Sequence, residues 1–148
     1  METFFKEPKK KKITLTKAKK KAWDACSLYV RMSAADVFGM ATCVTCDIRK
    51  HYKQMQAGHF VPGRGNAILF DIRGIHVQCF GCNIMKSGNP RKYEKFMKEK
   101  YGQKVINELD RLSDTTRKFT VEELLDIAEH YTNLVKRLQT KKSTRELV

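Results

Sequence analysis

The chain has 148 residues, enough for one modest domain with short appendages. Lys and Arg together number 30 against 16 Asp and Glu, which gives a formal charge of +14. This surplus favours a polyanionic partner, and nucleic acid is a better candidate than an anionic membrane. No apolar run approaches the roughly 20 residues of a membrane span, and the first residues lack the apolar segment of a secretory signal. We therefore expect a cytoplasmic protein with reduced thiols and no membrane partner.

Residues 1–15 are predicted to form a basic flexible arm that is solvated in the free protein and can contact phosphates when DNA is bound. A helical pattern follows over residues 16–39, with Thr16 as a plausible N-cap and Gly39 as its end. Cys26 lies in the apolar stripe of this helix, so it is expected to be a small buried hydrophobe rather than a fifth zinc ligand. Trp23 is likewise predicted to belong to the core rather than to stack on bases.

Residues 40–90 contain two Cys-x-x-C pairs, Cys43/Cys46 and Cys79/Cys82. Two such pairs supply four thiolates in the tetrahedral arrangement that Zn²⁺ prefers, and four protein ligands leave no open position. The pattern therefore predicts a structural zinc that replaces the core which so short a segment cannot build. A redox Cys-x-x-C is the alternative, but it would have one pair in a βαβ context.

The segment between the cysteine pairs is predicted to be a hairpin of two strands, Gln54–Phe60 and Ile68–Val77. A dense turn signal near Pro62 places Arg64 at the basic tip of this hairpin. Residues 83–86 resemble a first helical turn, which gives the order strand, strand, helix. We expect the α+β class, with a zinc-clamped finger flanked by helices.

Residues 91–141 are predicted to be a C-terminal helical region, with short helices over 91–100 and 104–112. Thr120 and Glu123 form a capping box that begins a long last helix. The apolar stripe of this helix is expected to pack on the first helix or on a second subunit. Residues 142–148 are predicted to be a frayed tail.

His59 and Asn83 are the candidate catalytic pair. An imidazole can take a proton from water near neutral pH, and a carboxamide oxygen suits Mg²⁺ or Mn²⁺. A phosphodiester attacked by water needs such a cation to offset charge on the scissile phosphate. Lys86 follows Asn83 by three residues and could steady the phosphate. A purely structural histidine in a zinc module is the alternative reading of His59.

The pattern C-x-x-C, GH, C-x-x-C-N-x-x-K resembles the ββα-metal (HNH-type) nuclease finger. Through AGHF, GIHVQCFGCNIMKSGN and YGQKVINELDRL the chain is most similar to the NinG (Rap) recombination endonucleases of lambdoid phages, and more distantly to endonuclease VII of phage T4. The resemblance implies a phage enzyme of the host cytoplasm that cuts branched recombination intermediates such as Holliday junctions and D-loops. It also implies His59 as general base, Asn83 as a metal ligand and the four paired cysteines as the zinc set.

The chain departs from the HNH pattern at two positions. Gly58 stands where many of these nucleases place an Asp or His metal ligand, and Gly74 replaces the middle Asn. We therefore expect another ligand of the catalytic Mg²⁺ or Mn²⁺, with His76 or Asp71 as candidates; His76 as a plain strand residue is the alternative.

Arg64, Lys86 and Arg91 are the predicted DNA contacts. The leading functional hypothesis is a metal-dependent, structure-selective endonuclease, and a homodimer would suit the symmetry of a junction. The alternative is a non-catalytic, zinc-containing DNA-binding accessory protein of recombination, which Gly58 favours. A sequence-specific HNH restriction or homing nuclease ranks last, because no separate target-recognition domain is visible.

Overall fold

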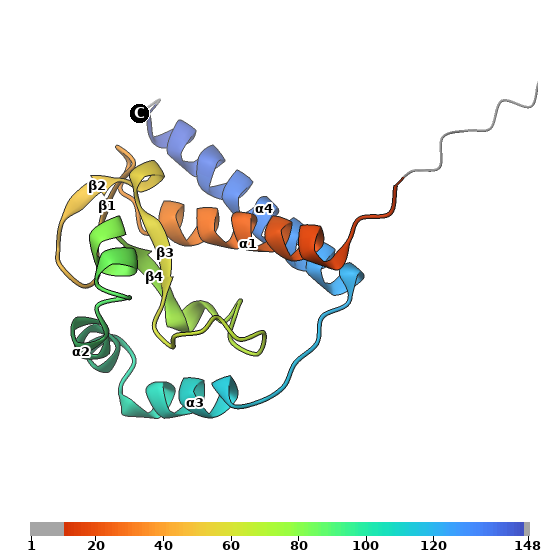
Figure 1. Cartoon of the computed structure of the whole chain (residues 1–148). Coiled ribbons are helices and arrows are strands. Elements are labelled where there is room, and N and C mark those ends of the chain that lie inside the picture. The colour runs from red at the N-terminus through yellow and green to blue at the C-terminus, as the bar shows by residue number, and fades with distance from the viewer. Residues whose placement is uncertain (1–10, 147–148) are drawn as a thin grey trace, which may run out of the picture.

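The computed structural model describes residues 11–146, so most of the basic arm predicted over 1–15 lies outside the described residues. Four helices surround two small antiparallel sheets (Figure 1), as expected for the α+β class. The helices are α1 (Leu15–Ser33), α2 (Pro90–Lys100), α3 (Gln103–Ser113) and α4 (Val121–Glu146). The strands are β1 (Met40–Thr42), β2 (Arg49–His51), β3 (Gln56–His59) and β4 (Ile75–Gln78).

The first helix is displaced toward the N-terminus relative to its predicted range. Its N-cap is Thr14, whose side chain accepts a hydrogen bond from the Lys17 backbone amide. The helix ends at Ser33 rather than continuing to Gly39. The Asp36 carboxylate accepts from the backbone amides of Phe38 and Met40, so this segment satisfies its donors in a loop instead of a helix.

The helices α1 and α4 pack along each other and form the largest helix–helix contact of the molecule (Figure 1). Small side chains at the contact allow a close approach of the two helices; the buried set comprises Ala18, Ala22, Leu124 and Ala128. The capping box that starts α4 is present, because Thr120 and Glu123 each accept a hydrogen bond from the other's backbone amide. Of the two expected partners for the last helix, the first helix is therefore the one observed.

The central hairpin pairs β3 with β4 in antiparallel register, with Gly58 opposite His76 and Gln56 opposite Gln78. Both strands are shorter than predicted. Ile68 and Leu69 are buried, but they lie in the long connection between the strands instead of extending the ladder. Their apolar side chains pack in the core although the backbone is not paired as a strand. The apolar pattern of a sequence alone does not distinguish a buried loop from a buried strand.

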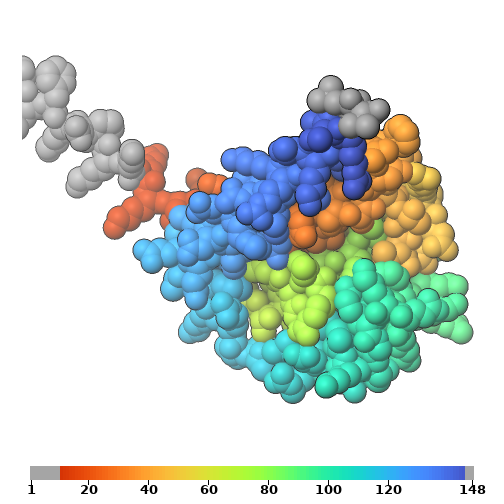
Figure 2. Space-filling model, turned by 180° about the vertical axis from the view of Figure 1, so that it is seen from behind, coloured from red at the N-terminus to blue at the C-terminus, as the bar shows by residue number. Residues whose placement is uncertain are grey.

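The helices α2 and α3 lie on the far side of the hairpin from α4. Figure 2 shows the β3–β4 connection between α4 and this pair of helices. The helices α2 and α3 share a core of Tyr93, Met97, Ile106 and Leu109. The helix α4 continues to Glu146, so residues 142–146 of the predicted frayed tail are helical, and residues 147 and 148 lie outside the described residues. None of the helices in residues 11–146 is both long and apolar enough to cross a membrane.

Candidate functional site

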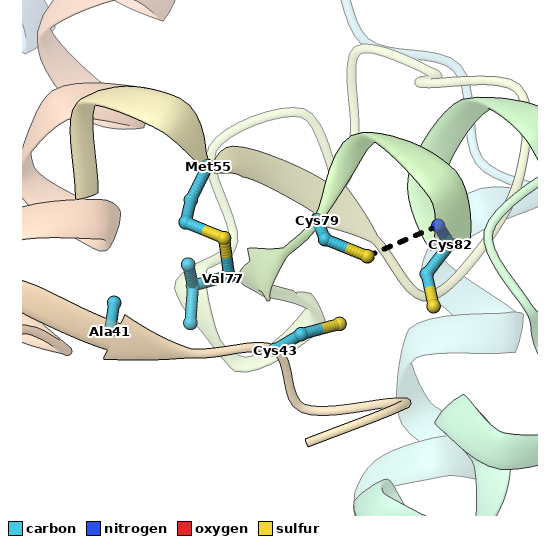
Figure 3. Close-up of a cluster of buried hydrophobic side chains, with 6 residues drawn as sticks. All are labelled: Ala41, Cys43, Met55, Val77, Cys79 and Cys82. Carbon is cyan, nitrogen blue, oxygen red and sulfur yellow. Dashed lines mark hydrogen bonds between the residues drawn. The ribbon is translucent and has the colours of Figure 1, made fainter. Parts of the chain in front are cut away.

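The four paired cysteines meet at one point, although they come from two separate hairpins. Cys43 and Cys46 lie in the turn between β1 and β2, and Cys79 and Cys82 follow β4. Their sulfur atoms all lie within 4.8 Å of one another. Figure 3 shows the sulfur atoms of Cys43, Cys79 and Cys82 turned toward a common centre. The Cys46 sulfur lies 3.7 Å from that of Cys79 and completes the set.

The surroundings of the cluster act in opposite directions on the pKa values of Cys43 and Cys46. Burial raises the pKa of Cys43, but hydrogen bonds from the Thr45 hydroxyl and from backbone amides outweigh it and lower the pKa to about 6. Burial and the neighbouring thiols raise the pKa of Cys46 to about 12. The Cys43 thiolate therefore forms readily, whereas the Cys46 thiolate needs a cation to hold its charge. Four soft thiolate donors at this spacing could bind a metal such as zinc, and the closed set would make that zinc structural.

Cys26 is not part of this cluster. It is fully buried between α1 and α4, and burial raises the pKa of its thiol to about 12. The prediction of a small buried hydrophobe is confirmed.

A cavity of about 650 Å³ opens between α1, β3 and the turn that follows Cys82. His59, Asn83 and Arg64 all line this cavity, so the structure brings together three residues predicted from distant positions in the sequence. Arg31 from α1 adds a second guanidinium to the wall. The cavity is therefore basic, as a binding site for phosphate would be.

His59 is held at the end of β3 in one defined tautomer. Its Nε2 lies 3.1 Å from the carbonyl oxygen of Leu69. Because a carbonyl can only accept, Nε2 carries the proton and Nδ1 keeps its lone pair. No residue that the structure describes forms a hydrogen bond with Nδ1. Burial lowers the pKa of His59, and the nearby Arg64 lowers it further, so the ring is neutral at neutral pH.

Trp23 belongs to this site as well as to the core, which the sequence did not reveal. The indole is half-buried, stacks on the His59 ring and lies 4.5 Å from the guanidinium carbon of Arg64. It also lines the cavity. An apolar helix face predicts burial of a tryptophan but not the identity of the side chains above its ring, so no signal in the sequence pointed to this role.

His76 and Asp71, the candidates for the additional metal ligand, lie elsewhere. His76 is buried, and its two ring nitrogens lie 3.0 and 2.8 Å from the hydroxyls of Tyr93 and Tyr101. Asp71 forms an ion pair with Arg73, which lowers the pKa of the carboxyl. Neither residue lines the cavity that contains His59 and Asn83. Both side chains already have partners, so the structure does not bring them to the site for which they were predicted.

The structure also separates two of the three predicted DNA contacts from the cavity. Lys86 lines a different hollow, beside Cys46 and Asp47. It directly follows the short π-helical turn Gly81–Met85 and does not line the cavity that contains Asn83. Arg91 is exposed in the first turn of α2, next to Pro90 at the cavity wall. Only Arg64 is within the cavity itself.

The missing side chain at Gly58 has a structural cause. A Cβ atom built on Gly58 would lie 1.9 Å from Oε1 of Gln78 and 2.9 Å from Oδ1 of Asn83. The space that a side chain at position 58 would fill is therefore taken by the side-chain oxygen of Gln78. Gln78 was not predicted as a site residue, because its position depends on strand register.

Comparison with known proteins places the chain in a family. The family model of the bacteriophage lambda NinG protein matches residues 4–142. The chain belongs to the NinG family. NinG proteins of Escherichia phage 933W and Salmonella phage P22 are 30% identical over 125 residues and 31% identical over 126 residues, each match covering 84% of this chain and 59% of the relative. The NinG protein of phage lambda is 28% identical over 125 residues, covering 84% of this chain and 58% of the relative.

The chain thus spans about three fifths of the length of these NinG relatives. No solved structure matches it.

Proposed function

We propose that this chain is a metal-dependent, structure-selective DNA endonuclease of the HNH type that cuts branched intermediates such as Holliday junctions and D-loops. One observation carries the proposal: a neutral imidazole with an unengaged Nδ1 and a carboxamide oxygen line the same basic cavity beside a four-cysteine cluster. The order of the cysteines, His59 and Asn83 along the chain supports a relation to HNH nucleases and to endonuclease VII of phage T4.

In this proposal His59 is the general base. Its Nδ1 takes a proton from the attacking water, while the Leu69 carbonyl holds the Nε2 proton in place and stabilises the ring once it is charged. Arg64, carried on the loop between β3 and β4 and stacked on Trp23, binds a phosphate oxygen of the DNA. The stacking leaves fewer orientations for the guanidinium and so lowers the entropy lost on binding.

Two kinds of metal fit the chain. Cys43, Cys46, Cys79 and Cys82 would hold a structural Zn²⁺ that joins the two hairpins. Asn83 would contribute an oxygen to Mg²⁺ or Mn²⁺ in the cavity. Bound there, a divalent cation would offset the negative charge that develops on the phosphate and the leaving oxygen.

The proposed partners are branched DNA in the host cytoplasm and a second copy of the chain. Two active sites related by two-fold symmetry would match the two opposing strands of a four-way junction. Measurement of the molar mass of the free protein and of its junction complex tests the second part.

The decisive experiment incubates a labelled four-way junction with zinc-loaded protein and Mg²⁺ or Mn²⁺. The native protein should nick or resolve the junction, and His59→Ala should bind it with unchanged affinity but not cut it. His130→Ala is the matched control, because His130 is exposed on α4 and away from the cavity; it should cut normally. Cutting by His59→Ala at the native rate would remove His59 from its role.

A non-catalytic DNA-binding accessory protein is the second candidate, favoured by Gly58, which cannot ligate a cation. It predicts junction binding that weakens steeply with salt, since each neutralised phosphate contributes roughly one unit to the log–log slope. It also predicts no cleavage with any divalent ion, whereas the endonuclease predicts both binding and cutting.

A further inference from the structure

We propose that the side-chain oxygens of Gln78 and Asn83 are the protein ligands of a divalent cation, and that Gly58 provides the space for them. The catalytic meaning of this site rests on the proposed endonuclease function. Three features define the site: an unpaired oxygen, a missing Cβ and the direction of two carboxamides.

Gln78 carries a buried oxygen that no described residue satisfies. The side chain is fully buried, and its Nε2 donates to the Thr45 hydroxyl at 3.1 Å and to the carbonyl oxygen of Gly88 at 2.9 Å. Because the Gly88 carbonyl cannot donate, the amide cannot be turned over without placing two acceptors together. Its Oε1 therefore points away from Gly88 and has no hydrogen-bond partner among the described residues. A buried acceptor without a partner is costly, so an ion or a donor group is expected beside it.

Gly58 lies where this oxygen points. Any other residue would place its Cβ 1.9 Å from Oε1 of Gln78, far inside the contact distance of two atoms. Glycine at position 58 therefore leaves room for a hard oxygen beside the cavity, and this oxygen comes from the opposite strand.

Asn83 directs a second oxygen to the same place. Its Nδ2 donates to Oε1 of Gln56 at 2.7 Å, which turns Oδ1 toward Gly58, 2.9 Å from the position of the missing Cβ. Unlike Gln78, Asn83 is only half-buried and lines the cavity, so the pair connects the protein interior with solvent.

The chemistry of this pair indicates the type of cation. Uncharged carboxamide oxygens are hard ligands that suit Mg²⁺ and Mn²⁺, which keep several waters and take further oxygens from phosphate. Neutral ligands near Arg31 and Arg64 predict weak binding in the free protein. A DNA phosphate in the cavity would supply the missing negative charge, so we expect tighter binding when DNA is present.

The test uses Mn²⁺ and the zinc-loaded full chain labelled with ¹⁵N. Paramagnetic Mn²⁺ should broaden the amide signals of Gln78, Asn83 and Gly58 first, in a saturable way. Gly58→Ala and Gln78→Met should weaken Mn²⁺ binding at least tenfold, whereas Gln54→Met, an exposed glutamine of the same region, should not change it. Zinc content and the undisturbed part of the spectrum show whether each variant is folded.

Asn83→Asp provides a gain-of-binding test at a half-buried position. A carboxylate in place of the amide should tighten Mn²⁺ binding at least fivefold if this oxygen is a ligand. The alternative is that the Asn83 amide donates to Gln78 and that no cation binds there. The proposal is overturned if no saturable broadening occurs near Gly58, or if none of the variants changes the Mn²⁺ titration.

The outcomes separate this inference from the proposed function. Junction cleavage without Mn²⁺ at Gln78 would leave the endonuclease intact and overturn the ligand assignment. Saturable Mn²⁺ binding at Gln78 and Asn83 without cleavage would support the ligand assignment and overturn the endonuclease.

Discussion

The imidazole of His59 stacks on the indole of Trp23, with ring centroids 4.9 Å apart and 26° between their planes. The two residues come from β3 and α1, so a helix outside the zinc module fixes the ring of the proposed base. The Leu69 carbonyl fixes the same ring at Nε2. One contact is on the face of the ring and the other at its edge, and together they define the direction of the Nδ1 lone pair better than either contact alone.

Replacement of Trp23 should therefore impair cleavage more than folding. We expect Trp23→Leu to slow junction cleavage by about tenfold to a hundredfold, because small misplacements of a catalytic group carry costs of this size. Trp23→Phe keeps an aromatic surface under His59 and Arg64 and should lose less. Cleavage rates and thermal unfolding of the two variants check this; equal rates in both would show that the aromatic surface is not needed.

The pH dependence of cleavage should show the environment of His59. Burial holds its pKa below the ordinary value of 6.5, and the proposed mechanism needs the neutral ring. The rate should rise with pH along an acid limb whose midpoint lies below 6.5 and then level off. Arg64→Gln removes a positive charge that lowers this pKa, so its midpoint should move upward. A midpoint well above 6.5 in the native protein would contradict a buried neutral base.

His76 should make the fold sensitive to acid. Burial lowers its pKa from 6.5 to about 4, so the unfolded chain takes up the proton first as the pH falls. The contribution of His76 to stability is complete above pH 6.5 and is lost progressively as the pH falls toward 4, by at most on the order of 3 kcal/mol.

His76→Phe removes this titration and leaves the zinc ligands in place. The free energy of unfolding, measured by denaturant at several pH values, should fall less steeply for the variant than for the native protein. Because zinc release affects both proteins alike, parallel curves would show that His76 does not titrate in this range.

Zinc removal should destabilise both the β1–β2 hairpin and the β3–β4 hairpin, because the four cysteines come from both. Cys82→Ser should lose the metal and destabilise the fold by several kcal/mol, since metal binding and folding are coupled in such sites. Cys26→Ala is the matched control, because Cys26 is buried outside the cluster; it should keep one Zn²⁺ per chain. Metal analysis and thermal unfolding measure both quantities, and full zinc occupancy in Cys82→Ser would argue against a four-cysteine site.

The sequence predicted well those features that depend on short motifs. The two Cys-x-x-C pairs and the capping box at Thr120 have geometries that vary little. His59 and Asn83 are far apart in the chain, and the order of the motifs predicts that they line one site. The ion pair between Asp71 and Arg73 also follows from local spacing, and it could have excluded Asp71 as a free ligand.

The sequence could not predict contacts that depend on register or on helix rotation. Gln78 reaches Gly58 only because of the β3–β4 pairing, and His76 finds its two tyrosines on α2 and at its C-terminal end. The start of α1 is ambiguous in the sequence because Thr14 and Thr16 are both good N-caps. The structure uses Thr14.

The cavity takes its walls from α1, from β3 and from the turn after Cys82. A fragment limited to residues 40–90 could still bind zinc, but it would lack the indole beneath His59. Transfer of that segment to another protein would therefore move the four-cysteine cluster but not the complete cavity. The smallest unit that keeps the cavity intact therefore includes the first helix.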